Sequence, residues 1–133
     1  MSSAHRILVH AHGGPDALSH EGFTPREPGP GEVRVAIEAV GVNYIDTYHR
    51  TGLYPIALPG ELGVEAAGTI EAVGPGVVNW APGDRVALLA ESRGTYASHI
   101  VISAELLFAL PDSIPADVAA AVLLKGITAW MLV

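Results

Sequence analysis

The chain has 133 residues, the size of one ordinary domain, and half of them are hydrophobic, so it is long enough to bury a core without a covalent staple. It has no cysteine, which excludes disulfides, thiolate zinc sites, iron–sulfur clusters and cysteine nucleophiles. The formal net charge is −7, and the seven basic residues are spread singly along the chain. No basic patch is present to hold nucleic acid.

The amino-terminal sequence MSSAHRILVHAHGG has neither the long apolar run nor the small-residue cleavage site of a signal peptide. A cytoplasmic location is therefore expected.

Glycine and proline recur at short intervals through the first 112 residues, and the runs between them alternate apolar and polar side chains, which is typical of β-strands. In the run EVRVAIEAV, for example, Val33, Val35 and Ile37 share one face, as in a half-buried strand. Short strands with tight turns favour a barrel or a sandwich, because those shapes hide sheet edges. The sequence predicts six strands, over residues 6–12, 32–40, 66–74, 84–90, 95–103 and 106–111.

Two histidines fall on the first predicted strand. His10 and His12 are two residues apart and would share one face of it. A metal site needs three or four convergent donors, and no third ligand can be identified for this pair. We expect no metal site here.

The stretch GVNYIDTYHRTGLY, which follows the second predicted strand, gathers polar groups in an otherwise apolar chain. Asn43 and Asp46 could be turn residues that bond to nearby backbone, with the three tyrosines as half-buried rings whose hydroxyls reach water. Alternatively, these groups line a pocket. The residues alone leave the two interpretations equally supported.

The turn sequence VGPGVVNWAPGDRV lies between the third and fourth predicted strands. Gly74 and Gly76 flank a proline, and no helix is expected after them. A phosphate-binding loop needs the amides of a helix N-terminus, so we interpret these glycines as turn residues.

After Pro111 the pattern changes to that of a helix. Ser113 is a possible cap, Pro115 would lie in the first turn and Asp117 near the positive end of the helix dipole. The apolar run that follows is too short to span a membrane and is interrupted by a lysine. This apolar helix stops at Val133 in mid-pattern, so we expect the chain to be the front portion of something longer or to rely on a partner.

Two side chains of this helix need separate comment. Lys125 is the only lysine, and in an apolar helix its ammonium must reach solvent or an anion. Trp130 is expected to be core.

Several motifs in this order resemble the amino-terminal domain of the medium-chain dehydrogenase/reductase superfamily, within it the zinc-independent, ζ-crystallin-like quinone oxidoreductases. The motifs are PGPGEVRVAIEAVGVNYIDTYHRTGLYP, PGELGVEAAGTIEAVGPGV, PGDRV, GTYASHIVI and AAAVLLKGITAW. The resemblance implies a mainly β fold, with residues 1–114 forming an incomplete GroES-like β-barrel. Residues 115–133 would be a junction helix toward a nucleotide-binding Rossmann domain that lies outside these 133 residues.

Two departures from the zinc-dependent relatives decide the subtype. Where those relatives carry a cysteine and a histidine, this chain has Asn43 and Val64. Valine cannot ligate zinc and asparagine does so poorly, and the four-cysteine structural zinc lobe is missing too. The expected chemistry uses no zinc.

The resemblance also implies a site. The residues that match Asn43, Asp46 and Tyr54 border the cleft where nicotinamide and substrate meet, and those that match Lys125 and Thr128 lie close to the cofactor. We therefore expect Asn43, Asp46 and Tyr54 to be catalytic, with Asn43, Tyr54, Lys125 and Thr128 contacting NADPH. Asn43 and Tyr54 would donate hydrogen bonds, and Asp46 would be a positioning acceptor.

The implied reaction is hydride transfer from NADPH to a quinone or an α,β-unsaturated carbonyl, without a metal. The nucleotide-binding loop lies outside the 133 residues, so the chain alone is expected to be inactive. An alternative is a standalone GroES-like binding or scaffolding module, whose apolar helix completes a partner or a homodimer. A third is a pocket that only binds small aromatic ligands. No nucleic acid or membrane partner is expected.

Overall fold

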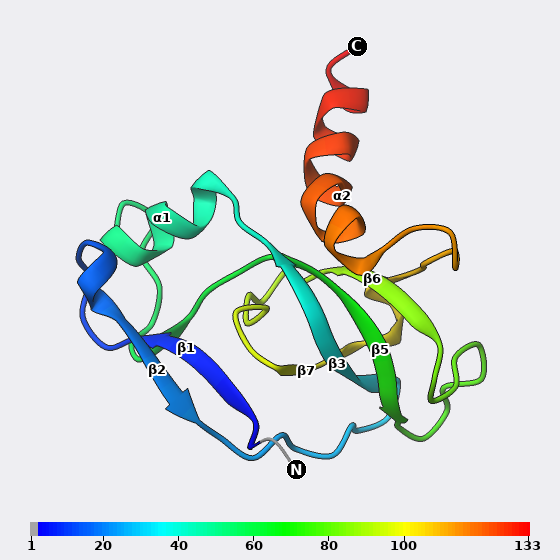
Figure 1. The fold of residues 1–133 in the computed structure, drawn as a ribbon. Coiled ribbons are helices and arrows are strands. Elements are labelled where there is room, and N and C mark those ends of the chain that lie inside the picture. Colours follow the sequence, from blue (N-terminus) through cyan, green and yellow to red (C-terminus); the bar gives the residue numbers. More distant parts are fainter. Residues whose placement is uncertain (1–2) are drawn as a thin grey trace.

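The computed structural model describes residues 3–133, which form two antiparallel sheets and a long carboxyl-terminal helix (Figure 1). One sheet has three strands in the order β2-β1-β4, and the other has five in the order β7-β3-β5-β6-β8. The mainly β prediction is confirmed. The strands are β1 (His5–Val9), β2 (Leu18–Gly22), β3 (Glu32–Gly41), β4 (Gly60–Glu61), β5 (Glu65–Val73), β6 (Arg85–Leu89), β7 (His99–Ser103) and β8 (Leu107–Ala109).

The two sheets are joined by the segment just before β7. The backbone N–H of Ile7, in β1, donates to the carbonyl of Tyr96 over 2.8 Å. On its other side the same segment accepts from β3, where the N–H of Ile37 donates to the carbonyl of Ser98, also over 2.8 Å. Residues 96–98 therefore connect the smaller sheet to the larger one.

The core lies against the inner face of the five-stranded sheet. Val33 and Val35 of β3 are fully buried, as their alternation predicts, and Ile37 packs partly against the same cluster. Burial of such side chains is the main stabilising contribution to a fold of this kind. The buried members of this cluster are Val33, Val35, Ala66, Ile70, Val86, Leu88, Ala90, Ile102 and Leu107.

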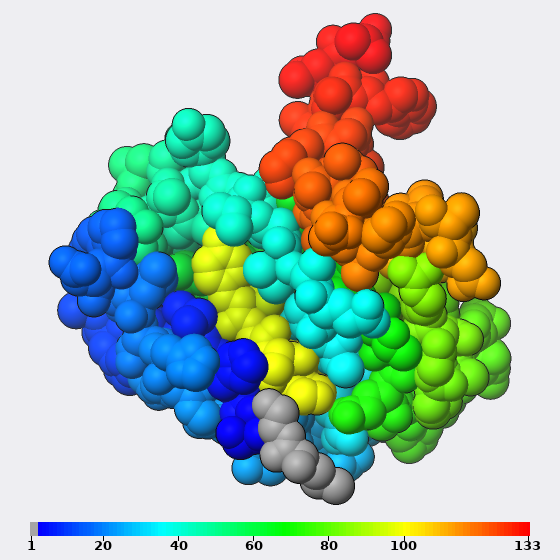
Figure 2. All heavy atoms as spheres, in the orientation of Figure 1, coloured from blue at the N-terminus to red at the C-terminus, as the bar shows by residue number. Residues whose placement is uncertain are grey.

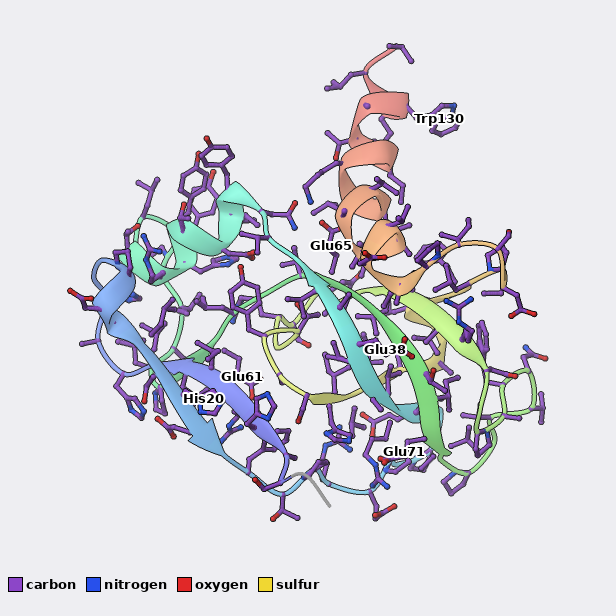
Figure 3. The ribbon with its side chains drawn as sticks, viewed as in Figure 1. His20, Glu38, Glu61, Glu65, Glu71 and Trp130 are labelled. Atoms are coloured by element: carbon purple, nitrogen blue, oxygen red, sulfur yellow. The ribbon has the colours of Figure 1, made fainter. Side chains whose placement is uncertain are left out.

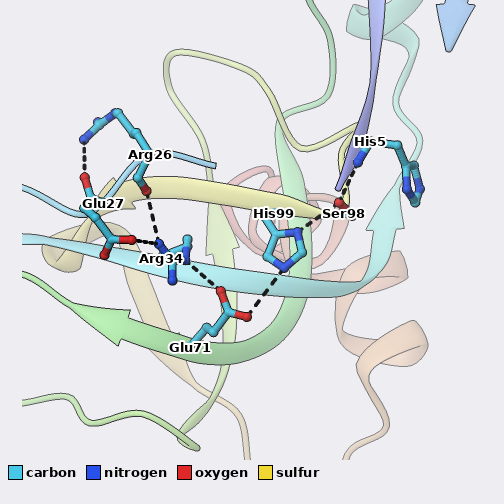
Figure 4. Close-up of polar contacts among 7 residues, drawn as sticks. All are labelled: His5, Arg26, Glu27, Arg34, Glu71, Ser98 and His99. Carbon is cyan, nitrogen blue, oxygen red and sulfur yellow. Dashed lines mark hydrogen bonds and ion pairs between the residues drawn. The ribbon is translucent and has the colours of Figure 1, made fainter. Parts of the chain in front are cut away.

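The polar side of β3 carries a network of charges (Figure 4). Arg34 donates to Glu71 of β5 over 2.7 Å and to Glu27 over 2.8 Å. His99 of β7 lies 3.7 Å from the same Glu71 carboxylate. These pairs join β7, β3 and β5 on their outer face.

All six predicted strands are present, although the first, fourth, fifth and sixth are shorter than predicted. The first ends at Val9, so His10 and His12 lie beyond it and their predicted shared face is wrong. His10 contacts the carboxylate of Glu21, and His12 contacts the carbonyl of Arg50. Strands β2 and β4 were not predicted.

A short helix, α1 (Tyr44–Thr51), occupies the polar segment after β3, where the sequence suggested turns. It begins after Asn43 and ends at Gly52, whose φ of 83° is the left-handed conformation that glycine adopts easily. The polar groups of this segment are therefore displayed on a helix.

The carboxyl-terminal helix, α2 (Ala116–Met131), begins after Pro115, so the predicted Ser113 cap is wrong. Its first turns pack on the sheet through the buried side chains of Ala119 and Ala120. The rest of α2 extends away from both sheets (Figures 1 and 2). Trp130 is 78% exposed and points outward (Figure 3), so the core prediction for this ring is wrong.

A helix that crosses a bilayer needs about 20 predominantly apolar residues. None of the helices within residues 3–133 is both long and apolar enough to cross one.

Candidate active site

Asn43 lies where β3 gives way to α1. Its side-chain Nδ2 donates to Glu65 Oε1 over 2.8 Å, and its backbone N–H donates to Asp46 Oδ2 over 2.9 Å. The residue is half-buried. These two bonds fix both the start of α1 and the direction of the amide side chain, because each removes a rotational freedom of the residue.

Glu65, the first residue of β5, is the acceptor at the centre of this site (Figure 3). It is fully buried. Its Oε1 accepts from Asn43 Nδ2 and, over 2.6 Å, from Lys125 Nζ, while Oε2 accepts from the backbone N–H of Leu124 over 2.8 Å. A buried carboxylate is costly unless it is paired and hydrogen-bonded, and here both conditions are met.

The sequence analysis missed Glu65. The sign that could have found it is an acidic residue inside the apolar run GVEAAG, because a glutamate is almost never fully buried without a partner. Its partner is Lys125, for which the sequence required either solvent or an anion. The structure gives it both, since the lysine side chain is half exposed and pairs with Glu65.

Lys125 and Thr128 lie one turn apart on α2, so their side chains are neighbours on the helix surface. The Thr128 hydroxyl donates to the carbonyl of Leu124 over 2.8 Å, and the residue is exposed. The Lys125 ammonium uses one of its donors on Glu65 and retains others for a ligand. These two side chains have the donors that an anionic or hydroxyl-rich cofactor would need.

Asp46 faces into the protein. It is 2% exposed, and Oδ2 accepts from the Tyr96 hydroxyl over 2.7 Å as well as from the Asn43 N–H. Burial, and secondly the bond to Asp46, raise the pKa of the Tyr96 phenol above its ordinary value. Asp46 thus links the start of α1 to the segment that joins the two sheets.

Tyr54 lies at the other end of α1, beyond its last turn. Its ring meets the rings of Tyr48 and His49 edge-on, with centroid distances of 5.3 and 6.3 Å, and it is 49% exposed. The chain turns at Gly52, and the backbone N–H of Tyr54 donates to the carbonyl of Tyr48 over 3.2 Å. Hydrogen bonds thus bring together Asn43, Lys125 and the unpredicted Glu65, whereas the ring contacts of Tyr54 are with Tyr48 and His49.

The residues at the zinc positions have no suitable donors. Val64 precedes Glu65 and carries no ligating atom, and the amide of Asn43 is bound to Glu65. Within residues 3–133 no group of three histidine, aspartate or glutamate side chains is arranged to hold a metal ion.

Residues 29–112 match the model of the alcohol dehydrogenase GroES-like domain. The chain belongs to this family. The resemblance to the amino-terminal part of the medium-chain dehydrogenases/reductases, and to their quinone oxidoreductases, is confirmed.

Two curated relatives and one solved structure define the similarity. A quinone oxidoreductase of Pseudomonas aeruginosa is 49% identical over 130 residues, which are 97% of this chain and 40% of the relative. A 2-haloacrylate reductase of Burkholderia is 39% identical over 131 residues, 94% of this chain and 39% of that protein. The crystal structure of Escherichia coli quinone oxidoreductase complexed with NADPH superimposes with a TM-score of 0.94 at 45% identity, covering 96% of this chain and 40% of that one.

The GroES-like chain thus spans about two fifths of the length of the relatives it matches. The fold class predicted from the sequence is confirmed, and the solved relatives are longer enzymes.

Proposed function

We propose that this chain is the amino-terminal portion of an NADPH-dependent oxidoreductase that transfers a hydride to a quinone or an α,β-unsaturated carbonyl without a metal. The observation that carries the proposal is the Asn43–Glu65–Lys125 cluster, which ties the sheet, α1 and α2 together. It occurs in a chain 45% identical to a quinone oxidoreductase crystallised with NADPH. In this proposal residues 1–114 are the catalytic barrel and 115–133 the junction helix.

Asn43 and Tyr54 have the donors for the developing negative charge. One Asn43 N–H is held by Glu65, which leaves a second N–H for a substrate or cofactor oxygen. The Tyr54 hydroxyl is on a half-exposed ring and is accessible to a ligand. Asp46 acts through Asn43, by holding its backbone N–H.

Lys125 and Thr128 would contact the cofactor from α2. Glu65 holds the ammonium of Lys125 in one place. The lysine side chain therefore loses less conformational entropy when a ligand binds. Bound NADPH would supply the hydride, and the chain's own residues would bind it, orient the acceptor and exclude water. The valine and asparagine at the zinc positions support a metal-free reaction.

The acceptor class includes conjugated carbonyls as well as quinones. Support comes from the 2-haloacrylate reductase that is 39% identical to this chain, because a 2-haloacrylate carries a carbon–carbon double bond conjugated to a carboxylate. Quinones have the same conjugated pattern of double bond and carbonyl.

A chimera tests the function. The 133 residues replace the matching segment of the Pseudomonas aeruginosa quinone oxidoreductase, to which they are 49% identical. We expect the purified chimera to oxidise NADPH in the presence of a quinone, and the 133-residue chain alone to give no steady-state turnover. A well-folded chimera that binds NADPH but reduces neither a quinone nor an enone would refute the proposal.

Two variants of the chimera test the residue roles. Asn43→Ala should lower kcat by about 10²-fold, the usual loss for one donor to a developing oxyanion. Glu27→Gln, on an exposed side chain of the β3 surface, is the matched control and should leave kcat unchanged. Equal rates in both variants would remove Asn43 from the catalytic role.

A standalone binding or scaffolding module is the second candidate. The observation that favours it is the exposure of apolar side chains along α2, among them Val118, Val122 and Trp130. Such a face favours a partner or a homodimer. Sedimentation and the binding of a hydrophobic dye test this alternative on the 133-residue chain. A monomer that binds no dye would contradict the binding or scaffolding module.

A further inference from the structure

Arg93, in the segment between β6 and β7, has an unusual backbone. Its φ of 66° is the only positive value among the non-glycine residues of the described chain, 3–133. Side chains of L-residues rarely adopt this conformation, and where they do the surrounding structure must hold it. Here the Arg93 N–H donates to the carbonyl of Ala90 over 3.2 Å, and the N–H of Gly94 donates to that of Leu62, also over 3.2 Å.

The Arg93 side chain has no hydrogen-bond partner among residues 3–133, in contrast to the other basic side chains. Its Nε is buried and unbonded. The remaining six of the seven lysine and arginine side chains donate to a carboxylate or a carbonyl. A buried donor without an acceptor is costly and is rare in native proteins. The Nη groups of the same guanidinium form no hydrogen bond within residues 3–133 either, so they are free to donate to the acceptor oxygens of a ligand.

Arg93 lines a cavity of about 370 Å³ between the two sheets. Figure 2 shows the segment of residues 90–100, in yellow, between the β1–β2 half of the molecule and β3. The wall formed by Arg6, Glu61, Ser92 and Arg93 also borders a second cavity of about 270 Å³. The volume of the larger cavity lies in the range of small-molecule sites.

Most charges on the cavity wall are compensated. Arg6 pairs with Glu61 over 3.0 Å, and Arg26 forms two bonds to Glu32, of 2.6 and 2.7 Å. The charge of Arg93 is not, and the Nε of Arg6 is a second buried donor without a partner in residues 3–133. Arg93 is therefore the one guanidinium of this wall, among residues 3–133, that has no hydrogen-bonded carboxylate or carbonyl.

We propose that this cavity binds a small oxyanion, a carboxylate or a phosphate, through the guanidinium of Arg93. Guanidinium groups recognise these planar or tetrahedral oxyanions by paired hydrogen bonds. The lining residues include none of Asn43, Tyr54 or Lys125, so this site is separate from the candidate active site. The protein as a whole carries a net charge of −7, so attraction of an anion must come from this local arrangement.

Calorimetric titration of the 133-residue chain tests the site. Inorganic phosphate and malonate are titrated separately, each against a background of sodium chloride at matched ionic strength. We expect saturable binding of at least one of them, at one anion per chain. The anion that binds more tightly identifies the ligand as a phosphate or a carboxylate. Absence of saturable binding for both anions would overturn the proposal.

Variants assign the binding to Arg93. Arg93→Gln should weaken binding at least tenfold, and so should Arg93→Gly, which keeps the fold because glycine adopts a positive φ without strain. Arg85→Gln is the control, since Arg85 donates to the carbonyls of Pro111 and Ile114 and does not line the cavity. Wild-type affinity in both Arg93 variants, or an equal loss in the Arg85 variant, would overturn the proposal.

Discussion

Glu65 is the residue on which the candidate active site depends. It holds Asn43 from one side and Lys125 from the other, and its second oxygen accepts a backbone N–H of α2. A buried ion pair adds little net stability on average, yet removing one partner is costly because the other donors are left unsatisfied. The direction of the Asn43 amide is therefore sensitive to this one carboxylate.

Glu65→Gln should lower the free energy of unfolding by about 2 to 3 kcal/mol, since an amide cannot accept all three donors and places its own N–H against one of them. Urea unfolding followed by circular dichroism measures the change. Glu27→Gln is the control, because that carboxylate is mostly exposed and surface pairs contribute less than about 1 kcal/mol. Equal losses in the two variants would contradict the role of Glu65.

His49 provides a second test, through pH. Burial first, and then repulsion by Arg93, lower the pKa of the His49 imidazole below its ordinary value of 6.5, while Asp46 opposes both. A lowered pKa in the folded state means that His49 contributes stability above pH 6.5, which is lost as the pH falls through the folded-state pKa.

Arg93→Gln should raise the pKa of His49, because one of the two causes of its lowering is removed. The fall of stability in acid should become correspondingly smaller. Nuclear magnetic resonance titration of the imidazole measures the first effect, and urea unfolding between pH 5 and 8 the second. Arg26→Gln serves as the control and should leave the His49 titration unchanged. An unaltered His49 pKa in the Arg93 variant would show that the two side chains are not coupled.

At the scale of elements, the approach of β3 to α2 decides how the site is assembled. Gly41 ends β3, and a Cβ at this position would collide with the carbonyl of Ala120 and the side chain of Glu65. The absence of a side chain is what allows the helix backbone to lie over the strand end and the Leu124 N–H to reach Glu65.

Gly41→Ala should destabilise the chain by about 3 kcal/mol, the upper range for overpacking, because the colliding atoms belong to backbone and to a buried side chain. Gly126→Ala is the matched control. No atom lies within 4 Å of its added Cβ, and alanine exceeds glycine in helix propensity by about 1 kcal/mol, so this variant should be more stable. Thermal unfolding of both variants gives the comparison, and a loss in the Gly126 variant would contradict it.

The sequence predicted the strands better than the helices. In strands such as β3, apolar and polar residues alternate along the sequence, and the structure buries the apolar ones, Val33 and Val35. Helix α1 has aromatic and β-branched residues of low helix propensity over eight positions, which hid it. The sequence does mark both ends of the helix. An asparagine followed three residues later by an aspartate is typical of a helix start, and a glycine is typical of a helix end. Strand β4 has two residues and is defined by its pairing with β1.

The site was predicted in part. Asn43 and Lys125 do share a partner, but that partner was missed because contacts across 22 and 60 residues are a property of the folded chain. Tyr54 was placed with Asn43 on the strength of the family resemblance alone. The roles of all these residues in the reaction remain predictions.

At the scale of the whole molecule, the two tryptophans have opposite environments. Trp80 packs against the main core, and its indole N–H donates to the carbonyl of Ala104 over 3.2 Å. Trp130 extends outward from α2 (Figure 3). The main core therefore packs against the first tryptophan, and the second lies outside it.

Trp80→Gln should cost about 3 kcal/mol of unfolding free energy, whereas Trp130→Gln should change it by less than about 0.5 kcal/mol. Urea unfolding of both variants measures these values at a protein concentration low enough for sedimentation to show a monomer. Sedimentation at higher concentration then reports whether Trp130 contributes to self-association. A large loss for Trp130→Gln under monomeric conditions would show that α2 folds back onto the sheets.

The three-donor arrangement at Glu65 also has a consequence for the order of events during synthesis. The Asn43 contact closes 22 residues and the Lys125 contact closes 60, so the first is available to the nascent chain long before the second and costs less loop entropy. Until the lysine leaves the ribosome, the Glu65 carboxylate has only the Asn43 side chain as a donor. We therefore expect the carboxylate to stay hydrated until α2 packs over it, because a buried charge needs its partners in place.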